Sequence, residues 1–191
     1  MDITTAIFYF SLLAWFGLEV VRQVKDIRAV PVLREADRGT IWLTTGFTLV
    51  GVAVGLWGAH AIPWYMPART SMAIFAIGIG LMWLGMLLRV WAIRTLGRFF
   101  RSVVMIQRDH ALVTSGPYRL LRHPSYAGAL LTGLGAGVVV GNWFSLAAFV
   151  LLPLIGYVRR IQIEEAALAE GLGDAYHTYA TASRRLVPFV W

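Results

Sequence analysis

The sequence has no cysteine and little charge. Without cysteine, neither a disulfide bond nor a thiolate metal site can form. The four histidines (His60, His110, His123 and His177) lack the spacing of a metal-binding motif, so we expect no metal site. Charged residues make up only 14% of the chain, against 58% hydrophobic residues and a mean hydropathy of +0.67. A chain of 191 residues has too small an interior to bury its recurrent apolar runs, which argues against a soluble domain.

Long apolar segments indicate the fold class. Runs of about 16 to 23 residues occupy positions 3–21, 41–61, 71–93, 124–141 and 143–158, close to the length that crosses a bilayer as a helix. The sequence therefore predicts an all-α integral membrane protein with five transmembrane helices and cytoplasmic amphipathic segments. Gly141 and Asn142 leave almost no loop between the last two runs, so these should form a tight C-terminal helical hairpin.

Basic residues predict the orientation. They follow the first, third and fifth runs, except that Arg89 lies at the inner end of the third run. The set is Arg22, Lys25, Arg28, Arg34, Arg38, Arg89, Arg94, Arg98, Arg101, Arg108, Arg119, Arg122, Arg159, Arg160, Arg184 and Arg185. Only Arg69 lies in a loop on the other side. The positive-inside rule then places the N-terminus outside and the C-terminus in the cytoplasm, in the inner membrane if the source is bacterial. The first run lacks a basic leader region and a cleavage site, so we expect it to remain as an anchor. The net charge of +7 fits this topology and an attraction to anionic lipid, with no nucleic acid as partner.

Glycines recur inside the apolar runs at spacings that suit close helix packing. They include Gly51, Gly55, Gly78, Gly85, Gly133, Gly137 and Gly141. The same spacing permits helix–helix dimers, so the oligomeric state stays open.

The most informative segment is LVTSGPYRLLRHPSY, residues 112–126, here called the hinge. Ionisable groups beside a bilayer are costly to desolvate, and a cluster of them marks a functional site. The predicted hairpin returns the chain to the same membrane face, so the hinge should meet residues 159–165, RRIQIEE. A third segment, residues 94–110, is amphipathic and suits the membrane interface.

Two acidic residues follow the fifth run. Arg160 and Glu164 are four residues apart and share one helix face, whereas Glu165 points about 100° away. One acid can pair with Arg160 while the other faces a different partner. The alternative to a functional role is a solvated ion pair that only stabilises the helix. Comparable alternatives hold for His123, as a capping histidine, and for the hinge tyrosines, as interfacial aromatic residues.

The motifs LVxxGPYxxxRHPxY, RxxxEE, LGxxYxxY and RRxxP occur in this order between residues 96 and 188. In order and spacing the chain resembles the isoprenylcysteine carboxyl methyltransferase family of integral membrane methyltransferases. That family in turn resembles phospholipid N-methyltransferases, and its fold is related to that of membrane sterol reductases. The resemblance implies one membrane domain, residues 1–191. Residues 1–93 would supply three transmembrane helices, and residues 94–191 the cofactor-binding and catalytic half.

The resemblance also implies S-adenosylmethionine (SAM) as methyl donor, bound by the C-terminal hairpin and its cytoplasmic caps. Matching the motifs assigns to the cofactor pocket His110, Leu112, Val113, Gly116, Tyr118, Arg122, His123, Tyr126 and Glu165. Arg160 and Glu164 would be catalytic, at the side of a lipophilic small-molecule or prenylated acceptor. A carboxylate acceptor is already nucleophilic, so Arg160 would hold it and Glu164 would orient Arg160. With a thiol or hydroxyl acceptor, Glu164 would be the general base.

Three functions compete at this point. The first is methyl transfer from SAM to a carboxylate, thiol or amine of a lipophilic compound or phospholipid. The second is an NADPH-dependent membrane reductase of the related fold, for which the sequence has no diagnostic phosphate-binding residues. The third is a membrane scaffold whose arginines contact lipid only.

Overall fold

The structure, a computed structural model, describes residues 2–29, 39–97 and 112–187, with side chains for all of these except 25–29. Its elements are the helices α1 (Ile3–Ala29), α3 (Thr40–Ala61), α4 (Met72–Leu96), η2 (Gly116–Arg119), α5 (Pro124–Val140), α6 (Trp143–Leu172) and α7 (Asp174–Ala182). The regular elements among these residues are all helical, apart from two isolated bridges.

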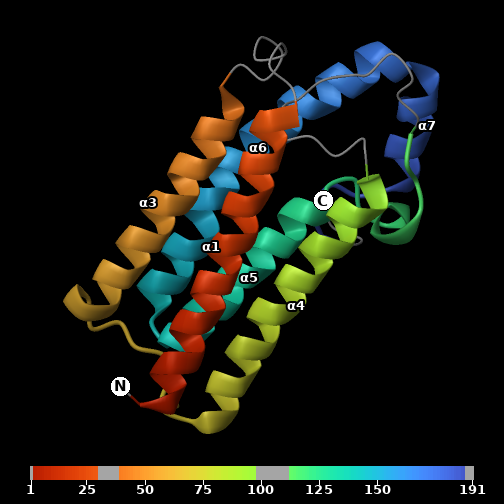
Figure 1. Cartoon of the computed structure of the whole chain (residues 1–191). Helices are drawn as coiled ribbons and strands as arrows, with labels where there is room; N and C mark the ends of the chain where they lie inside the picture. The colour runs from red at the N-terminus through yellow and green to blue at the C-terminus, as the bar shows by residue number, and fades with distance from the viewer. Residues whose placement is uncertain (1, 30–38, 98–111, 188–191) are drawn as a thin grey trace.

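The predicted all-α membrane class is confirmed. Among the described residues, α1, α3, α4 and α6 are long and apolar enough to cross a membrane. The fifth predicted span, α5, is a shorter apolar helix of 17 residues, so the count of five spans stays a prediction. The chain is nevertheless a multi-pass membrane protein, in which α1, α3, α4, α5 and α6 run along one another (Figure 1).

One boundary differs from the prediction. We expected the fifth span to end near residue 158, but α6 continues unbroken for 30 residues. The cause is local, because residues 161–170 include many strong helix formers and no proline or glycine. The helix ends at Gly173, whose φ of 54° lies in the region that favours glycine. The end of α6 therefore projects past the bundle, and α7 turns back from it toward η2 (Figure 1).

Glycines let α4 and α5 pack closely. A Cβ atom at Gly85 would lie 2.5 Å from the carbonyl oxygen of Gly128, and one at Gly135 would lie 2.6 Å from that of Gly78. Both distances are too short for any larger residue. The glycine spacing seen in the sequence is thus used inside the bundle.

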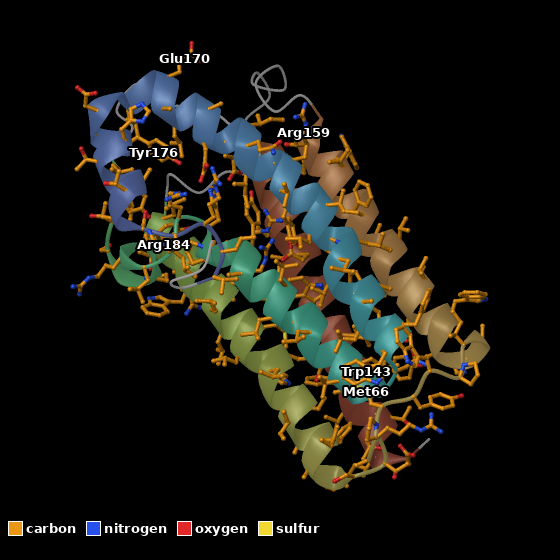
Figure 2. All side chains as sticks on the ribbon, turned by 180° about the vertical axis from the view of Figure 1, so that it is seen from behind. Met66, Trp143, Arg159, Glu170, Tyr176 and Arg184 are labelled. Atoms are coloured by element: carbon orange, nitrogen blue, oxygen red, sulfur yellow. The ribbon has the colours of Figure 1, made fainter. Side chains whose placement is uncertain are left out.

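The turn between α5 and α6 is as tight as predicted. Gly141 takes a left-handed conformation with φ 66°, and the Asn142 side chain accepts a hydrogen bond from the Ser145 amide at 3.1 Å. The Asn142 amide nitrogen donates to the Ile62 carbonyl at 2.8 Å, which fixes this turn to the end of α3. Figure 2 shows this end, with Met66 and Trp143, opposite the end that carries Arg159, Tyr176 and Arg184.

Candidate active site

The hinge and the paired glutamates meet at one end of the bundle. The Arg122 Nε atom lies 2.9 Å from an oxygen of Glu165, and the Tyr126 hydroxyl donates to Glu164 at 2.6 Å. These contacts join residues about 40 positions apart. The predicted juxtaposition is confirmed, and so is its cause, the short hairpin that returns α6 beside the start of α5.

The segment after α7 completes this end. It pairs in parallel with the hinge through the backbone, because the Arg122 amide donates to the Arg184 carbonyl at 2.6 Å and the His123 amide to the Arg185 carbonyl at 3.0 Å. The Arg185 guanidinium also lies 2.9 Å from the second oxygen of Glu165. The Glu165 carboxylate is thus held between two arginines from separate segments.

Arg160 lies below these residues, and only 4% of it is exposed. Its Nε atom is 2.7 Å from the Tyr126 hydroxyl oxygen and 2.9 Å from a Glu164 oxygen. Its Nη1 atom reaches the Thr40 hydroxyl of α3 at 3.4 Å. The alternative of a solvated ion pair is therefore wrong, because the fold removes this pair from solvent.

His123 lies between the two acids. Its ring nitrogens are 3.4 Å from Glu164 and 3.3 Å from Glu165. Burial alone would lower the pKa of His123, but the hydrogen bonds to both carboxylates outweigh burial and raise this pKa above its ordinary value. The His123 ring also stacks on Tyr126, whose ring stacks on Tyr157, with centroids 5.7 and 4.9 Å apart. This aromatic column connects the acids to the interior of the bundle.

The remaining predicted cofactor residues lie in or beside η2. Leu112 and Val113 are half-buried in the coil before it, Gly116 begins it with φ 55°, and Tyr118 is buried. His110 and most of the predicted interfacial segment, from residue 98 onward, lie outside the described residues. The cofactor-binding roles of all these residues stay predictions.

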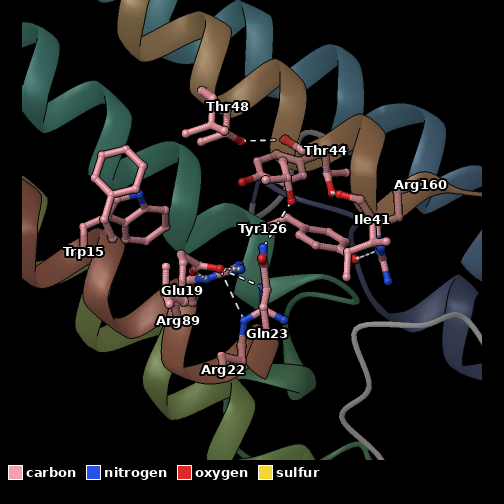
Figure 3. Close-up of a pocket in the computed structure, with 15 residues that line it drawn as sticks. Trp15, Glu19, Arg22, Gln23, Ile41, Thr44, Thr48, Arg89, Tyr126 and Arg160 are labelled. Carbon is pink, nitrogen blue, oxygen red and sulfur yellow. Dashed lines mark hydrogen bonds and ion pairs between the residues drawn. The ribbon is translucent and has the colours of Figure 1, made fainter. Parts of the chain in front are cut away.

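A cavity of about 280 Å³ extends from Arg160 into the bundle (Figure 3). Its wall comes from α1, α3, α4, α5 and α6, so the N-terminal helices form much of it. Tyr126, assigned from its motif to the cofactor side, lies in this wall together with Arg160 and Tyr157. Its hydroxyl also contacts Glu164, so Tyr126 lies between the cavity and this acid.

A buried ion network that was not predicted from the sequence lies in this cavity. Arg89 on α4 hydrogen-bonds through two nitrogens to the Glu19 carboxylate on α1, and it also donates to the Ser125 carbonyl and hydroxyl at 2.9 and 2.8 Å. Arg22 contacts Glu19 at 2.7 Å. The signal was available, because Glu19 is an acid inside an apolar span, and such a residue marks a site by default.

Comparisons with known proteins agree with this geometry. Residues 77–170 match the model of the isoprenylcysteine carboxyl methyltransferase (ICMT) family. A protein-S-isoprenylcysteine O-methyltransferase of Arabidopsis thaliana is 39% identical over 115 residues, which are 59% of this chain and 58% of that protein. The enzyme of the same name from Schizosaccharomyces pombe is 38% identical over 112 residues, which are 58% of this chain and 46% of that protein.

Structure comparison gives the same result. The solved structure of a eukaryotic intramembrane Ras methyltransferase of this family is 29% identical in sequence, with a TM-score of 0.63 over 76% of this chain and 52% of that one. The matched class is that of helical membrane methyltransferases. The particular resemblance expected from the hinge and the paired acids, to the isoprenylcysteine carboxyl methyltransferase family, is confirmed. The chain spans about three fifths or less of the length of the curated relatives named here.

Proposed function

We propose that this protein is a SAM-dependent membrane methyltransferase that methylates the carboxylate of a lipophilic acceptor, such as an isoprenylcysteine or a similar small amphiphile. One observation carries the proposal. Arg160 is buried in the wall of a cavity inside the bundle. Tyr126 and Glu164 connect it to the end of the bundle that carries Glu165, Arg122 and Arg185, here called the polar end. A lipophilic acceptor and a water-soluble donor can thus approach one residue from two sides.

The polar end suits the donor chemically. SAM carries a carboxylate, an amine and a cationic sulfonium, and this end offers Glu165 with Arg122 and Arg185. The Tyr176 hydroxyl on α7 is buried and has no hydrogen-bond partner within the described part of the chain. Burial raises the pKa of Tyr176, so its hydroxyl remains protonated and able to donate. A buried group without a partner fits a site whose ligand completes the hydrogen bonding.

When bound, SAM would supply an electrophilic methyl group, to which a carboxylate oxygen would bond directly as the methyl–sulfur bond breaks and the thioether S-adenosylhomocysteine leaves. The reaction needs no general base, since the acceptor is ionised at neutral pH. The protein positions the two reactants and excludes water from them, and these two effects together lower the activation barrier by several kcal/mol. Arg160 binds the acceptor carboxylate with its planar guanidinium and aims one oxygen toward the polar end.

Glu164 and Tyr126 limit how strongly Arg160 binds. The acceptor loses its negative charge as the methyl group arrives, so an arginine that binds the anion too tightly stabilises the ground state more than the transition state. Because the Arg160 Nε atom also contacts Glu164 and Tyr126, Arg160 binds the acceptor carboxylate less tightly, and the orientation of its guanidinium is fixed.

We further propose that the polar end faces the cytoplasm and the N-terminus the outside. The described arginines support this orientation, because all except Arg69 lie toward the end where α1, α4 and α6 finish. Within it, residues 94–191 bind the donor, and the helices of residues 1–93 supply much of the acceptor cavity.

The test is methyl transfer from labelled SAM by purified protein to a panel of lipophilic acids, thiols and amines. We expect an ester product, and we expect Arg160→Ala to lower turnover by about 100-fold or more while SAM affinity is retained. Arg159→Ala is the matched control, because Arg159 is the adjacent arginine and is exposed. An active Arg160→Ala protein, or a thioether or amine product, would contradict the proposal.

A further inference from the structure

Glu19 is an acid inside α1, one of the helices that are long and apolar enough to cross a membrane. Both of its carboxylate oxygens meet arginines, since Arg89 on α4 binds it through two nitrogens and Arg22 approaches it at 2.7 Å. An ion pair taken out of water loses so much solvation that an apolar pair of similar volume often stabilises a fold equally well. Stability alone therefore does not account for Glu19, and an ionisable residue at such a position indicates a function.

The helix α1 presents one face to Arg89. Trp15 and Glu19 are four residues apart, so they are neighbours on that face. The guanidinium carbon of Arg89 lies 5.5 Å from the centre of the Trp15 ring, and two guanidinium nitrogens contact the Glu19 carboxylate (Figure 3). Arg89 is only 6% exposed. Contacts from α1 therefore fix the direction in which the Arg89 side chain points.

The third guanidinium nitrogen of Arg89 contacts the start of α5. This atom, Nη1, donates to the Ser125 carbonyl at 2.9 Å and to the Ser125 hydroxyl at 2.8 Å. Ser125 lies in the first turn of α5, which begins at Pro124 and receives no side-chain cap from His123. An uncapped first turn depends on contacts from outside the helix. Arg89 supplies one such contact, and the backbone pairing of the hinge supplies another.

This first turn carries Tyr126, which follows Ser125 directly. Whatever fixes Ser125 therefore also fixes the backbone that carries the Tyr126 ring. The Tyr126 hydroxyl lies 2.7 Å from the Arg160 Nε atom and donates to Glu164 at 2.6 Å. Side-chain contacts and one peptide bond thus connect Glu19 on α1 to Arg160 on α6.

We infer that Glu19 is a positioning residue for methyl transfer: it directs Arg89 to the first turn of α5, and this turn holds Tyr126 where it orients the Arg160 guanidinium. The inference rests on the proposed function. It assigns a role to a residue outside residues 77–170, which match the family model and include Arg89 and Ser125. The helix α1 then contributes to the orientation of Arg160 as well as to the wall of the cavity.

The test separates positioning from stability. Its variants are Glu19→Gln and the double variant Glu19→Gln with Arg89→Gln, because the double variant removes both charges and should recover much of the lost stability. Trp83→Phe is the matched control. The Trp83 indole nitrogen on α4 donates to the Ser11 hydroxyl on α1 at 3.2 Å, so this variant also removes a polar contact between the two helices, but not at the start of α5.

Each purified protein is assayed with labelled SAM and a panel of lipophilic acids that includes S-farnesyl-N-acetylcysteine. The assay temperature is one at which circular dichroism shows every variant to be folded. In parallel, 3-fluorotyrosine in place of Tyr126 reports the surroundings of that ring by fluorine NMR.

We expect both Glu19 variants to lower kcat/KM for the acceptor by roughly tenfold or more, because a small displacement of a positioning group is costly to the rate. Trp83→Phe should change it by less than about twofold. The fluorine resonance should shift in both Glu19 variants and stay unchanged in the control.

Three results would overturn the inference alone: an unchanged kcat/KM in Glu19→Gln, a kcat/KM that recovers with stability in the double variant, or an unshifted resonance. In each case Glu19 would act on stability and not on Tyr126. An absence of transfer by the wild-type protein to any acceptor would overturn the proposed function as well.

Discussion

Two ion networks in this molecule differ in what supports them. The network at the polar end joins Glu165 to Arg122 and Arg185, and backbone pairing of the hinge with residues 184–185 braces it. The network in the cavity joins Glu19 to Arg89 and Arg22, and no strand-like pairing supports it in the described part of the chain. The first should tolerate the loss of one contact, whereas the second depends on charge balance within apolar helices.

The largest loss of unfolding free energy should come from removing one charge of the cavity network. Glu19→Gln leaves Arg89 buried without its counterion, and breaking a buried pair in this way costs about 3–5 kcal/mol of unfolding free energy. Denaturant unfolding in detergent measures the loss. Glu170→Gln, at an exposed position of α6, is the control.

A double variant sharpens this prediction. Glu19→Gln with Arg89→Gln removes both charges, so it should recover a large part of the stability lost by Glu19→Gln alone. If the double variant is the less stable protein, the cost does not come from an unpaired charge, and the comparison between the two networks fails.

A smaller loss of unfolding free energy is expected from a substitution at the polar end. The Arg122 Nη1 atom donates to the carbonyls of Ala180 and Ser183 at 2.6 and 2.7 Å, which fixes the end of α7. Arg122→Ala should cost about 2 kcal/mol, the scale of hydrogen bonds from a charged donor. We expect it to raise amide hydrogen exchange in α7 selectively. Arg119→Ala, at an exposed position of η2, should leave this exchange unchanged.

The two networks also differ in how far the sequence predicts them. The polar end could be foreseen, because its residues lie in short motifs and the Gly141–Asn142 turn dictates which helix ends meet. The contact between Glu19 and Arg89 could not be predicted from the sequence, because the residues are 70 positions apart and the rotation of each helix in a bundle depends on packing. Apolar spans lack the polar pattern that would reveal this rotation. The continuous α6 was missed for a different reason, since a change from apolar to polar composition does not end a helix.

The pH dependence of stability should reflect the polar end, where His123 contacts Glu165. The raised pKa of His123 means that its contribution is fully present below pH 6.5, the ordinary value, and is lost as pH rises through the folded-state pKa. The groups facing it are Glu164 and Glu165. The stability difference between wild type and His123→Gln should therefore shrink from pH 6 toward alkaline pH, as measured by chemical unfolding. A difference that grows with pH would contradict a protonated His123 between the acids.

The smallest predicted effect contrasts two glycines outside both networks. Gly116 in the hinge has φ 55°, and a Cβ there would lie 3.1 Å from the Thr95 hydroxyl oxygen. Gly80 on α4 has no atom within 4 Å of its Cβ position. Gly116→Ala should cost about 1 kcal/mol, because alanine is strained at positive φ. Gly80→Ala should be neutral or slightly stabilising, since alanine favours helix.

Thermal unfolding of both variants checks this, and an equal response would mean that the hinge conformation is not held by Gly116. A selective loss at Gly116 would instead show that the start of η2, and with it the hinge that positions Arg122 and His123, depends on a backbone conformation as well as on charge.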